Sequence, residues 1–194
     1  MQITSKNIWP TQIWECKLSL DQKFNLNLWE DICKINTSSA STDFNLFEHQ
    51  GQYIQTLKEK LIETANVVLF DLDKEIKSIS RGWVNFNSVG ASAQPHSHFV
   101  NLVGVYYISS PENGGDLCLI DPSPGTRISG KDKTGNTGYF IKPTSSTLVL
   151  FPGLINHFVT QNNSNEPRIS VAINFVIGDK HGENYEHNNK DISS

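Results

Sequence analysis

Two histidines separated by one residue, His96 and His98, are the residues whose type and spacing most directly indicate chemistry. In an extended strand, residues i and i+2 point to the same face, so the two imidazoles are predicted to converge. A third histidine, His157, follows the run 147–153, which is typical of a buried strand and turn that returns beside the first pair. Neutral imidazole is a common ligand of iron and zinc. The three residues are candidate metal ligands, with polar packing as the alternative.

The other histidines, His49, His181 and His187, lack such a pattern. His49 lies in a loop before a predicted helix, and the other two lie in a polar tail. We interpret all three as surface residues.

Arg168 follows His157 by eleven residues, and Arg168 and Ser170 share a face of the next predicted strand. An arginine at a strand start is often a surface charge. A guanidinium can also pair with a carboxylate through two parallel hydrogen bonds, to which a neighbouring hydroxyl adds a third. A metal cluster followed by this Arg-x-Ser pattern is more specific than either feature alone.

The N-terminal part is predicted to contain a strand and two helices. An extended segment covers residues 8–20, and Asp21 is positioned to cap a helix over 25–35 whose apolar residues recur at helical spacing. Residues 36–45 are rich in Ser and Thr and predict a loop. A longer helix is predicted over 51–72.

After Glu75, short apolar runs alternate with turn residues. Eight strands are predicted, over 78–87, 94–99, 103–109, 115–120, 138–141, 147–151, 156–161 and 168–177. This density of strands indicates a mainly β jelly roll with flanking helices. We expect a single domain over 1–179, in which 1–77 supply the N-terminal strand and helices and 78–179 the β core, followed by a polar tail over 180–194.

Composition limits the possible functions. The 194 residues carry a net charge of −4, which argues against charge-driven binding to nucleic acid. Three widely separated cysteines do not form a disulfide framework, and we expect a reducing cytoplasm. No signal peptide is apparent, and no apolar run reaches the roughly 20 residues of a membrane span.

The combined pattern resembles the Fe(II)/2-oxoglutarate-dependent oxygenase superfamily. That family has an HxD or HxE pair, a distal His, and about ten residues later an Arg that binds the far carboxylate of 2-oxoglutarate. The matching segments are Pro95-His-Ser-His98, Phe151-Pro-Gly-Leu-Ile-Asn-His157 and Arg168-Ile-Ser170. Residues 104–108 and 113–122 look like central strands of prolyl-hydroxylase-like members. The likeness is greatest to a group of 2-oxoglutarate/Fe(II) oxygenases from marine bacteria and their phages.

The resemblance implies a double-stranded β-helix (jelly roll, cupin-like) core with the N-terminal helices packed on it. It implies Fe(II) held by His96, His98 and His157, with 2-oxoglutarate and O2 as cosubstrates. Arg168 and Ser170 would bind the 5-carboxylate, and Tyr107 matches a cosubstrate-binding tyrosine, though Tyr106 could serve instead. Asn85 and Asn87 could reach the cosubstrate or support backbone groups. Residues 123–136 could form a lid or a plain surface loop.

One position departs from the family pattern, because His98 stands where the carboxylate ligand is usual. His98 could be a true third ligand, water or chloride could take its place, or Asp116 or Asp121 could approach. We favour the three-histidine site, in which a neutral imidazole leaves one more positive charge on the metal centre. This should strengthen the binding of anionic 2-oxoglutarate.

The favoured function is hydroxylation of a substrate C–H bond. A cupin-like metal-binding protein without turnover is the main alternative. A zinc hydrolase is disfavoured because no Asp or Glu general base neighbours either histidine motif. Peptidyl groups, small molecules and a nucleobase all remain open as substrates, as does the oligomeric state.

Overall fold

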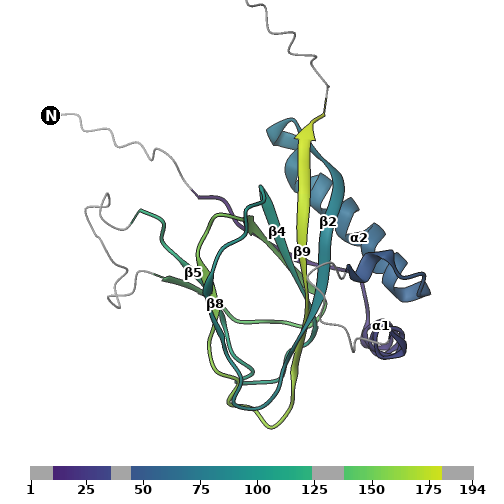
Figure 1. The fold of residues 1–194 in the computed structure, drawn as a ribbon, viewed down its shortest axis with the longest axis vertical. Coiled ribbons are helices and arrows are strands. Elements are labelled where there is room, and N and C mark those ends of the chain that lie inside the picture. The colour runs from purple at the N-terminus through teal and green to yellow at the C-terminus, as the bar shows by residue number, and fades with distance from the viewer. Residues whose placement is uncertain (1–10, 36–44, 124–137, 181–194) are drawn as a thin grey trace, which may run out of the picture.

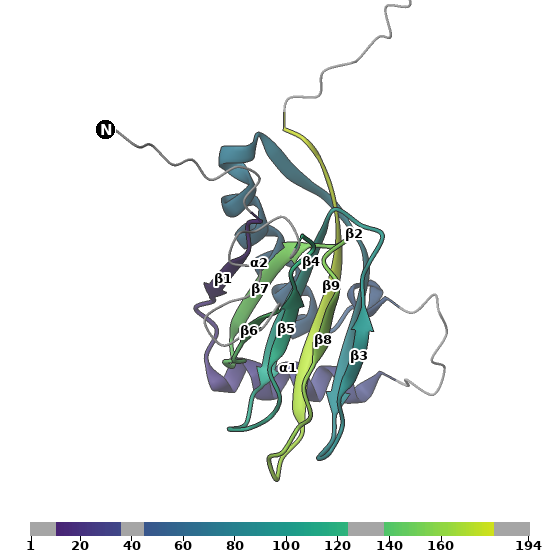
Figure 2. The same cartoon turned by 90° about the vertical axis from the view of Figure 1, so that its left-hand side faces the viewer.

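Two antiparallel β-sheets face each other, and two helices cover the outer face of the larger sheet (Figures 1 and 2). The computed structural model describes residues 11–35, 45–123 and 138–180. The elements in chain order are β1 (Trp14–Lys17), α1 (Gln22–Lys34), η1 (Leu46–Glu48), α2 (Gln52–Leu69), η2 (Phe70–Leu72), β2 (Lys74–Asn87), β3 (Ala93–His96), β4 (Leu102–Ser109), β5 (Leu117–Ile120), β6 (Gly138–Ile141), β7 (Thr147–Pro152), β8 (His157–Val159) and β9 (Arg168–Asp179). The expected double-stranded β-helix with helices on one side is confirmed.

The larger sheet has the strand order β1-β7-β4-β9-β2. Its outer face packs on α1 and α2, because alternate residues of each strand point that way. On β9 these are Ile169, Val171, Ile173 and Phe175, all buried in one apolar cluster with Leu28, Leu57 and other helical residues. The helices form because their apolar residues recur at helical spacing, and they are stabilised by packing these residues against the sheet.

The smaller sheet has the order β3-β8-β5-β6 and faces the inner side of the larger sheet (Figure 2). A second apolar cluster, with Val103, Val105, Phe151 and Leu117 among its members, fills one part of the space between the sheets. The remaining inner surface carries the polar side chains predicted to form a site.

The helix predictions agree with the structure except at their ends. Asp21 caps α1 as expected, since its side chain accepts a hydrogen bond from the Phe24 backbone N–H at 2.7 Å. The second helix was predicted to reach Leu72 but ends at Leu69. A 3₁₀ turn follows and closes at Asp73, whose φ of 53° is left-handed and stops the helix.

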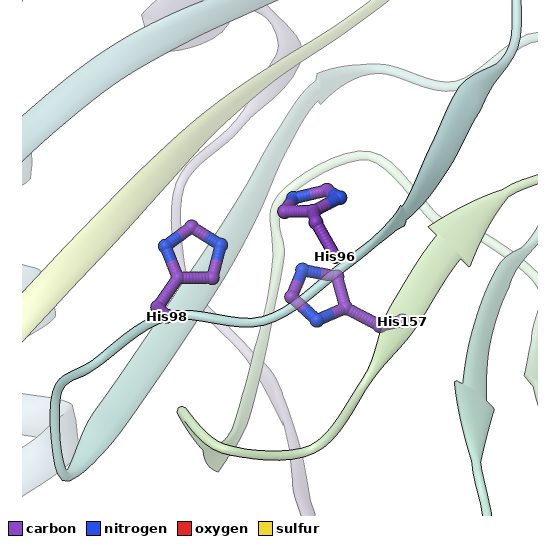
Figure 3. Close-up of side chains that lie close together, drawn as sticks. All are labelled: His96, His98 and His157. Carbon is purple, nitrogen blue, oxygen red and sulfur yellow. The ribbon is translucent and has the colours of Figure 1, made fainter.

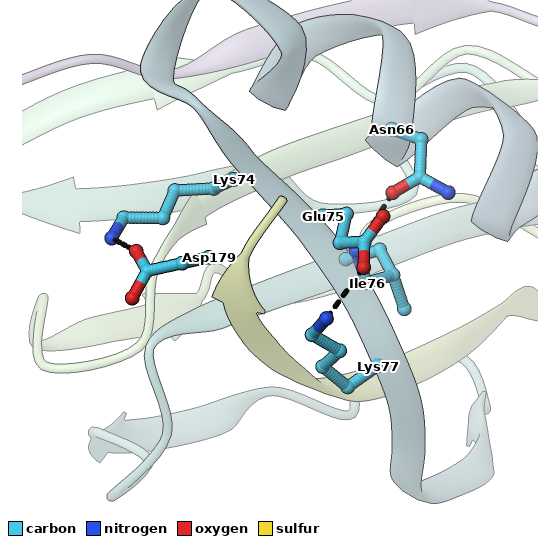
Figure 4. A network of polar contacts seen from close by, with 6 residues as sticks. All are labelled: Asn66, Lys74, Glu75, Ile76, Lys77 and Asp179. Atoms are coloured by element: carbon cyan, nitrogen blue, oxygen red, sulfur yellow. Dashed lines mark hydrogen bonds and ion pairs between the residues drawn. The ribbon is translucent and has the colours of Figure 1, made fainter. Parts of the chain in front are cut away.

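The β2 and β9 strands pair from Asn87 and Arg168 out to Lys74 and Asp179, farther than predicted. At that end a polar network joins them to α2 (Figure 4). The Asn66 side chain accepts from the Ile76 backbone N–H at 2.7 Å, and Lys74 pairs with Asp179. These contacts lie where the pairing of β2 and β9 extends beyond the apolar core.

Several expectations fall wholly or partly outside the described residues: the start of the first strand and the Ser/Thr-rich loop, most of the proposed lid, and the tail with His181 and His187. Within the described parts, the predicted first strand is limited to Trp14–Lys17. None of the described helices combines the length and hydropathy that crossing a membrane requires.

Candidate metal centre

His96, His98 and His157 come together between the two sheets (Figure 3). One ring nitrogen from each lies within 4.8 Å of the others. Strand pairing explains two of the three positions, because His96 on β3 and His157 on β8 are direct cross-strand neighbours. Their ring centroids lie 4.4 Å apart, and each is 5.2 Å from that of His98. The cluster can hold one metal ion.

His98 reaches the cluster by a route that strand alternation did not predict. The strand ends at His96, so the expectation of one extended strand over 94–99 is wrong. The His98 backbone N–H instead donates to the Gly153 carbonyl at 2.8 Å. A Cβ on Gly153 would lie 2.2 Å from the Val100 carbonyl oxygen, so only glycine permits this close approach. The turn after β7 therefore positions His98.

Backbone carbonyls orient the other two imidazoles. Nδ1 of His96 lies 2.8 Å from the Gln94 carbonyl oxygen, and Nδ1 of His157 lies 2.9 Å from that of Ile155. A proton on each Nδ1 satisfies the carbonyl and leaves the Nε2 lone pair for a metal. Phe151 packs edge-on against His157 at 4.9 Å and fixes its ring from the core side.

Burial favours the neutral imidazole that a metal ligand requires. Desolvation lowers the pKa of His157 to about 4, and the charges of His96 and His98 act in the same direction. Burial is also the main cause that lowers the pKa of His98, with smaller contributions from His96 and Arg81 and an opposing one from Asn174. Both rings are therefore neutral at neutral pH, with one ring nitrogen free to bind a metal.

Neither Asp116 nor Asp121 joins the three histidines as a member of the cluster that the described residues form. The Asp116 backbone N–H instead donates to the hydroxyl of Thr160, the residue after β8, at 2.7 Å. The geometry gives no support to a carboxylate ligand from either residue.

Arg168 lies on the inner face of β9 and is 1% exposed. Its Nη1 donates to Asn87 Oδ1 at 3.2 Å and lies 3.4 Å from the Ser170 hydroxyl. No carboxylate of the described residues forms an ion pair with it. An uncompensated buried guanidinium is costly, so this residue is suited to an anionic ligand.

Tyr107 lies beside Arg168 and Ser170 on the same face. It pairs with Ser170 in the sheet register, and the Arg168 guanidinium lies 4.9 Å from its ring centroid. Tyr106 points to the opposite face, where its hydroxyl donates to Asn25 at 2.7 Å. The alternative role for Tyr106 is therefore wrong, because strand alternation places it among the helices.

These side chains have free hydrogen-bonding capacity that fits a carboxylate. Among the described residues, Tyr107 Oη and Arg168 Nε are both buried without a hydrogen-bond partner. Burial raises the pKa of Tyr107, and the neighbouring Arg168 guanidinium opposes this effect. Buried polar groups normally have partners, so two adjacent donors without one indicate a missing acceptor. Asn85 is paired with Ser170 in the register and lies in the same row of the inner face. This observation suits the five-carbon dicarboxylate that the sequence resemblance implies.

Sequence reasoning missed one close neighbour of the cluster, Trp83. Its ring stacks on His98 with centroids 5.5 Å apart. Cζ of Arg81 lies over the Trp83 ring, 5.2 Å from its centroid. Two-residue alternation along β2 places Arg81 and Trp83 on the same face as Asn85 and Asn87, so the sequence could have identified Trp83 as an inward-facing residue.

Residues 81–174 match the sequence model of a family described as "Putative 2OG-Fe(II) oxygenase". The matched segment runs from Arg81 to Asn174 and contains the histidine cluster and Arg168. No curated protein matches the chain.

Solved structures share the fold at low sequence identity. AviO1 from Streptomyces viridochromogenes Tue57 is 11% identical with a TM-score of 0.63, over 86% of this chain and 90% of that one. A prolyl-4-hydroxylase from Pseudomonas putida is 15% identical with a TM-score of 0.58, over 86% and 88%. A prolyl hydroxylase from Trichoplax adhaerens, in complex with a hypoxia inducible factor peptide, is 12% identical with a TM-score of 0.58, over 84% and 83%.

The family match over residues 81–174 and the shared fold make the β core of this chain similar to 2-oxoglutarate- and Fe(II)-dependent oxygenases, and the resemblance seen in the sequence is confirmed. The family implies Fe(II) and 2-oxoglutarate as cofactor and cosubstrate.

Proposed function

We propose that this protein is a 2-oxoglutarate-dependent dioxygenase that hydroxylates a substrate C–H bond at an iron centre with three histidine ligands. In the reaction, R–H, 2-oxoglutarate and O2 give R–OH, succinate and CO2. The observation that carries the proposal is the convergence of His96, His98 and His157 beside an unpaired, buried Arg168. Three ligands on one side of the metal leave positions for cosubstrate and O2.

The chain's own residues have separate tasks under this proposal. The three Nε2 or Nδ1 atoms would hold Fe(II), which when bound supplies the activation of O2. Arg168 and Ser170 would bind the 5-carboxylate of 2-oxoglutarate, and Tyr107 would donate a hydrogen bond to it. The free Nε of Arg168 and the free hydroxyl of Tyr107 support these roles. Asn87 would keep the guanidinium oriented through its bond to Nη1.

An anaerobic titration tests the proposal. Fe(II) and 2-oxoglutarate added to the protein should give a weak visible charge-transfer band. The His157→Ala variant should lose it. A band that is absent in the wild type, or that survives in His157→Ala, contradicts the iron assignment.

His98 requires its own experiment because it replaces the usual carboxylate. His98→Ala should weaken Fe(II) binding, whereas His98→Asp should retain it by supplying a carboxylate in place of the imidazole. Iron affinity unchanged in His98→Ala would show that water or another group takes the third position.

A second candidate function is metal binding without turnover, on the same scaffold. The histidine at the carboxylate position is the observation that favours it. Succinate release decides between the two. The oxygenase produces succinate in the presence of Fe(II), O2 and 2-oxoglutarate, and a binding protein does not.

We propose a peptidyl group or a small molecule as the substrate. The prolyl hydroxylases of similar fold, one of them in complex with a peptide, support a peptide.

A further inference from the structure

The inner face of the larger sheet carries a second cationic group, at the opposite end from Arg168. Side chains on this face form four rows across β2, β9 and β4. The first two rows contain Asn87 with Arg168, and then Asn85 with Ser170 and Tyr107. The third row contains Trp83 with Ala172 and Val105. The fourth contains Arg81 with Asn174 and Val103.

The metal cluster lies against the third row, because the Trp83 ring stacks on His98. The pocket proposed for 2-oxoglutarate lies on one side of this row, and Arg81 lies on the other. Any substrate must approach the metal from a direction that the cosubstrate does not occupy. The fourth row, with Arg81 and Asn174, is the part of this face that remains.

Arg81 has unused binding capacity. Among the described residues, its Nε, a hydrogen-bond donor, is buried without a partner. No carboxylate of the described residues forms an ion pair with Arg81. Its guanidinium lies over the Trp83 ring, at 5.2 Å from the centroid. The side chain is therefore preorganised beside the metal cluster without a charge partner.

2-Oxoglutarate itself does not account for this cation. The Arg168 guanidinium lies against Tyr107 in the second row, and the Arg81 guanidinium lies against Trp83 in the third. A 5-carboxylate bound at Arg168 would be paired there, and the 1-carboxylate of the same molecule would be taken up by the metal in the proposed site. Neither carboxylate would then neutralise Arg81.

We infer that Arg81 binds an anionic group, either a carboxylate or a phosphate, of the substrate to be oxidised. The inference rests on the proposed function, since it takes the histidine cluster as the metal site. Arg81 is assigned as a specificity-determining residue that sets which end of the substrate lies away from the metal.

The test uses the full-length protein with Fe(II) and saturating 2-oxoglutarate, without O2, so that the Arg168 pocket is already occupied. Straight-chain carboxylates of four to eight carbons are then added, along with the primary amides and phosphate monoesters of the same chains. Binding is read as a change in the charge-transfer band. We expect a carboxylate or a phosphate ester to bind at least about tenfold more tightly than its amide. The two anionic series distinguish the two sources of charge.

Three variants make the result specific. Arg81→Gln should abolish the preference for the anion, and Arg81→Lys should keep part of it, because the charge remains. Lys23→Gln removes an equal charge from an exposed position on α1, behind the sheet, and should behave like the wild type. If Arg81→Gln does not fold, Arg81→Lys is used instead, and it should show a reduced but persistent preference for the anion over its amide.

Equal binding of anions and amides by the wild type, absence of binding by any probe, or a preference that survives in Arg81→Gln would overturn the inference. Failure of the proposed function is distinguishable, because the charge-transfer band would then be missing before any probe is added.

Discussion

The two faces of the larger sheet are built from the same strands but carry opposite kinds of residue. The outer face of β9 presents Ile169, Val171, Ile173 and Phe175 to the helices. The inner face presents Arg168, Ser170, Ala172 and Asn174 to the smaller sheet. The outer face is closed by apolar packing. The inner face keeps buried donors and acceptors without partners, among them atoms of Arg81, Tyr107 and Arg168.

The difference shows how this fold separates stability from chemistry. Apolar burial against the helices stabilises the sheet, with roughly 25 cal/mol for each Å² of apolar surface removed from water. That rigid support lets the opposite face retain a buried guanidinium and a free phenol, which would be destabilising in a core of their own. Substitutions on the two faces should therefore affect different measurements.

The largest effect is expected at the metal cluster. His157→Ala removes a buried ligand, and even the loss of an outer-sphere partner costs about 10- to 100-fold in metal affinity. We expect Fe(II) affinity to fall by at least about 100-fold, together with succinate formation. Equilibrium dialysis with Fe(II) under anaerobic conditions measures the change. Wild-type affinity in this variant would remove His157 from the site.

On the outer face, Ile173→Ala should act on stability alone. Ile173 is fully buried beneath the helices, and truncating such a residue typically costs about 2–5 kcal/mol. Urea unfolding measures the loss. Below the unfolding transition, the affinity for 2-oxoglutarate should equal that of the wild type. A marked fall in that affinity would show that the two faces are coupled.

On the inner face, Arg168→Ala should act mainly on cosubstrate binding. Hydrogen bonds to charged groups contribute about 1.5–3 kcal/mol, which corresponds to roughly 10- to 150-fold weaker binding of 2-oxoglutarate. Titration of the charge-transfer band measures it. Unchanged 2-oxoglutarate affinity would place the 5-carboxylate elsewhere.

A pair of adjacent tyrosines compares the two faces with one chemical change. Tyr107→Phe removes an inward hydroxyl without a partner and should weaken 2-oxoglutarate binding by about 0.5–1.5 kcal/mol. Tyr106→Phe removes the outward hydroxyl that donates to Asn25, and should lower the free energy of unfolding by a similar amount. Titration with 2-oxoglutarate and urea unfolding of both variants measure the two quantities. If both variants lost cosubstrate affinity equally, or stability equally, the assignment of the two tyrosines to opposite faces would be contradicted.

A separate effect is expected from pH in the metal-free protein. The pKa of His157 is about 4 in the folded state and near 6.5 when unfolded, so the unfolded chain binds more protons between these values. This contribution to stability is complete above pH 6.5 and declines as the pH falls towards 4. Urea unfolding across this range measures the slope, which should be shallower in His157→Asn. An equal slope in both proteins would mean that His157 is not buried in its neutral form.

Much of this arrangement could be predicted from the sequence, because it depends on local periodicity. Helical spacing and the capping Asp21 located α1, and the two-residue alternation of β9 correctly placed Arg168 and Ser170 on one face. The roles of these residues and of the histidines stay predictions. The motif spacing also indicated the oxygenase family, which the match over residues 81–174 confirms.

Other features depended on contacts between segments distant in the sequence. His98 leaves the strand and is positioned by Gly153, 55 residues later, through a single backbone hydrogen bond. The choice of Tyr107 over Tyr106 followed from which face the helices cover. The row that joins Arg81 to Asn174 required the register of β2 against β9. The sequence alone thus determined which residues could bind a metal and an anion, through their chemistry and local spacing. Only the tertiary structure decided which of them share a face and which remain without partners, because strand pairing and helix packing are long-range interactions.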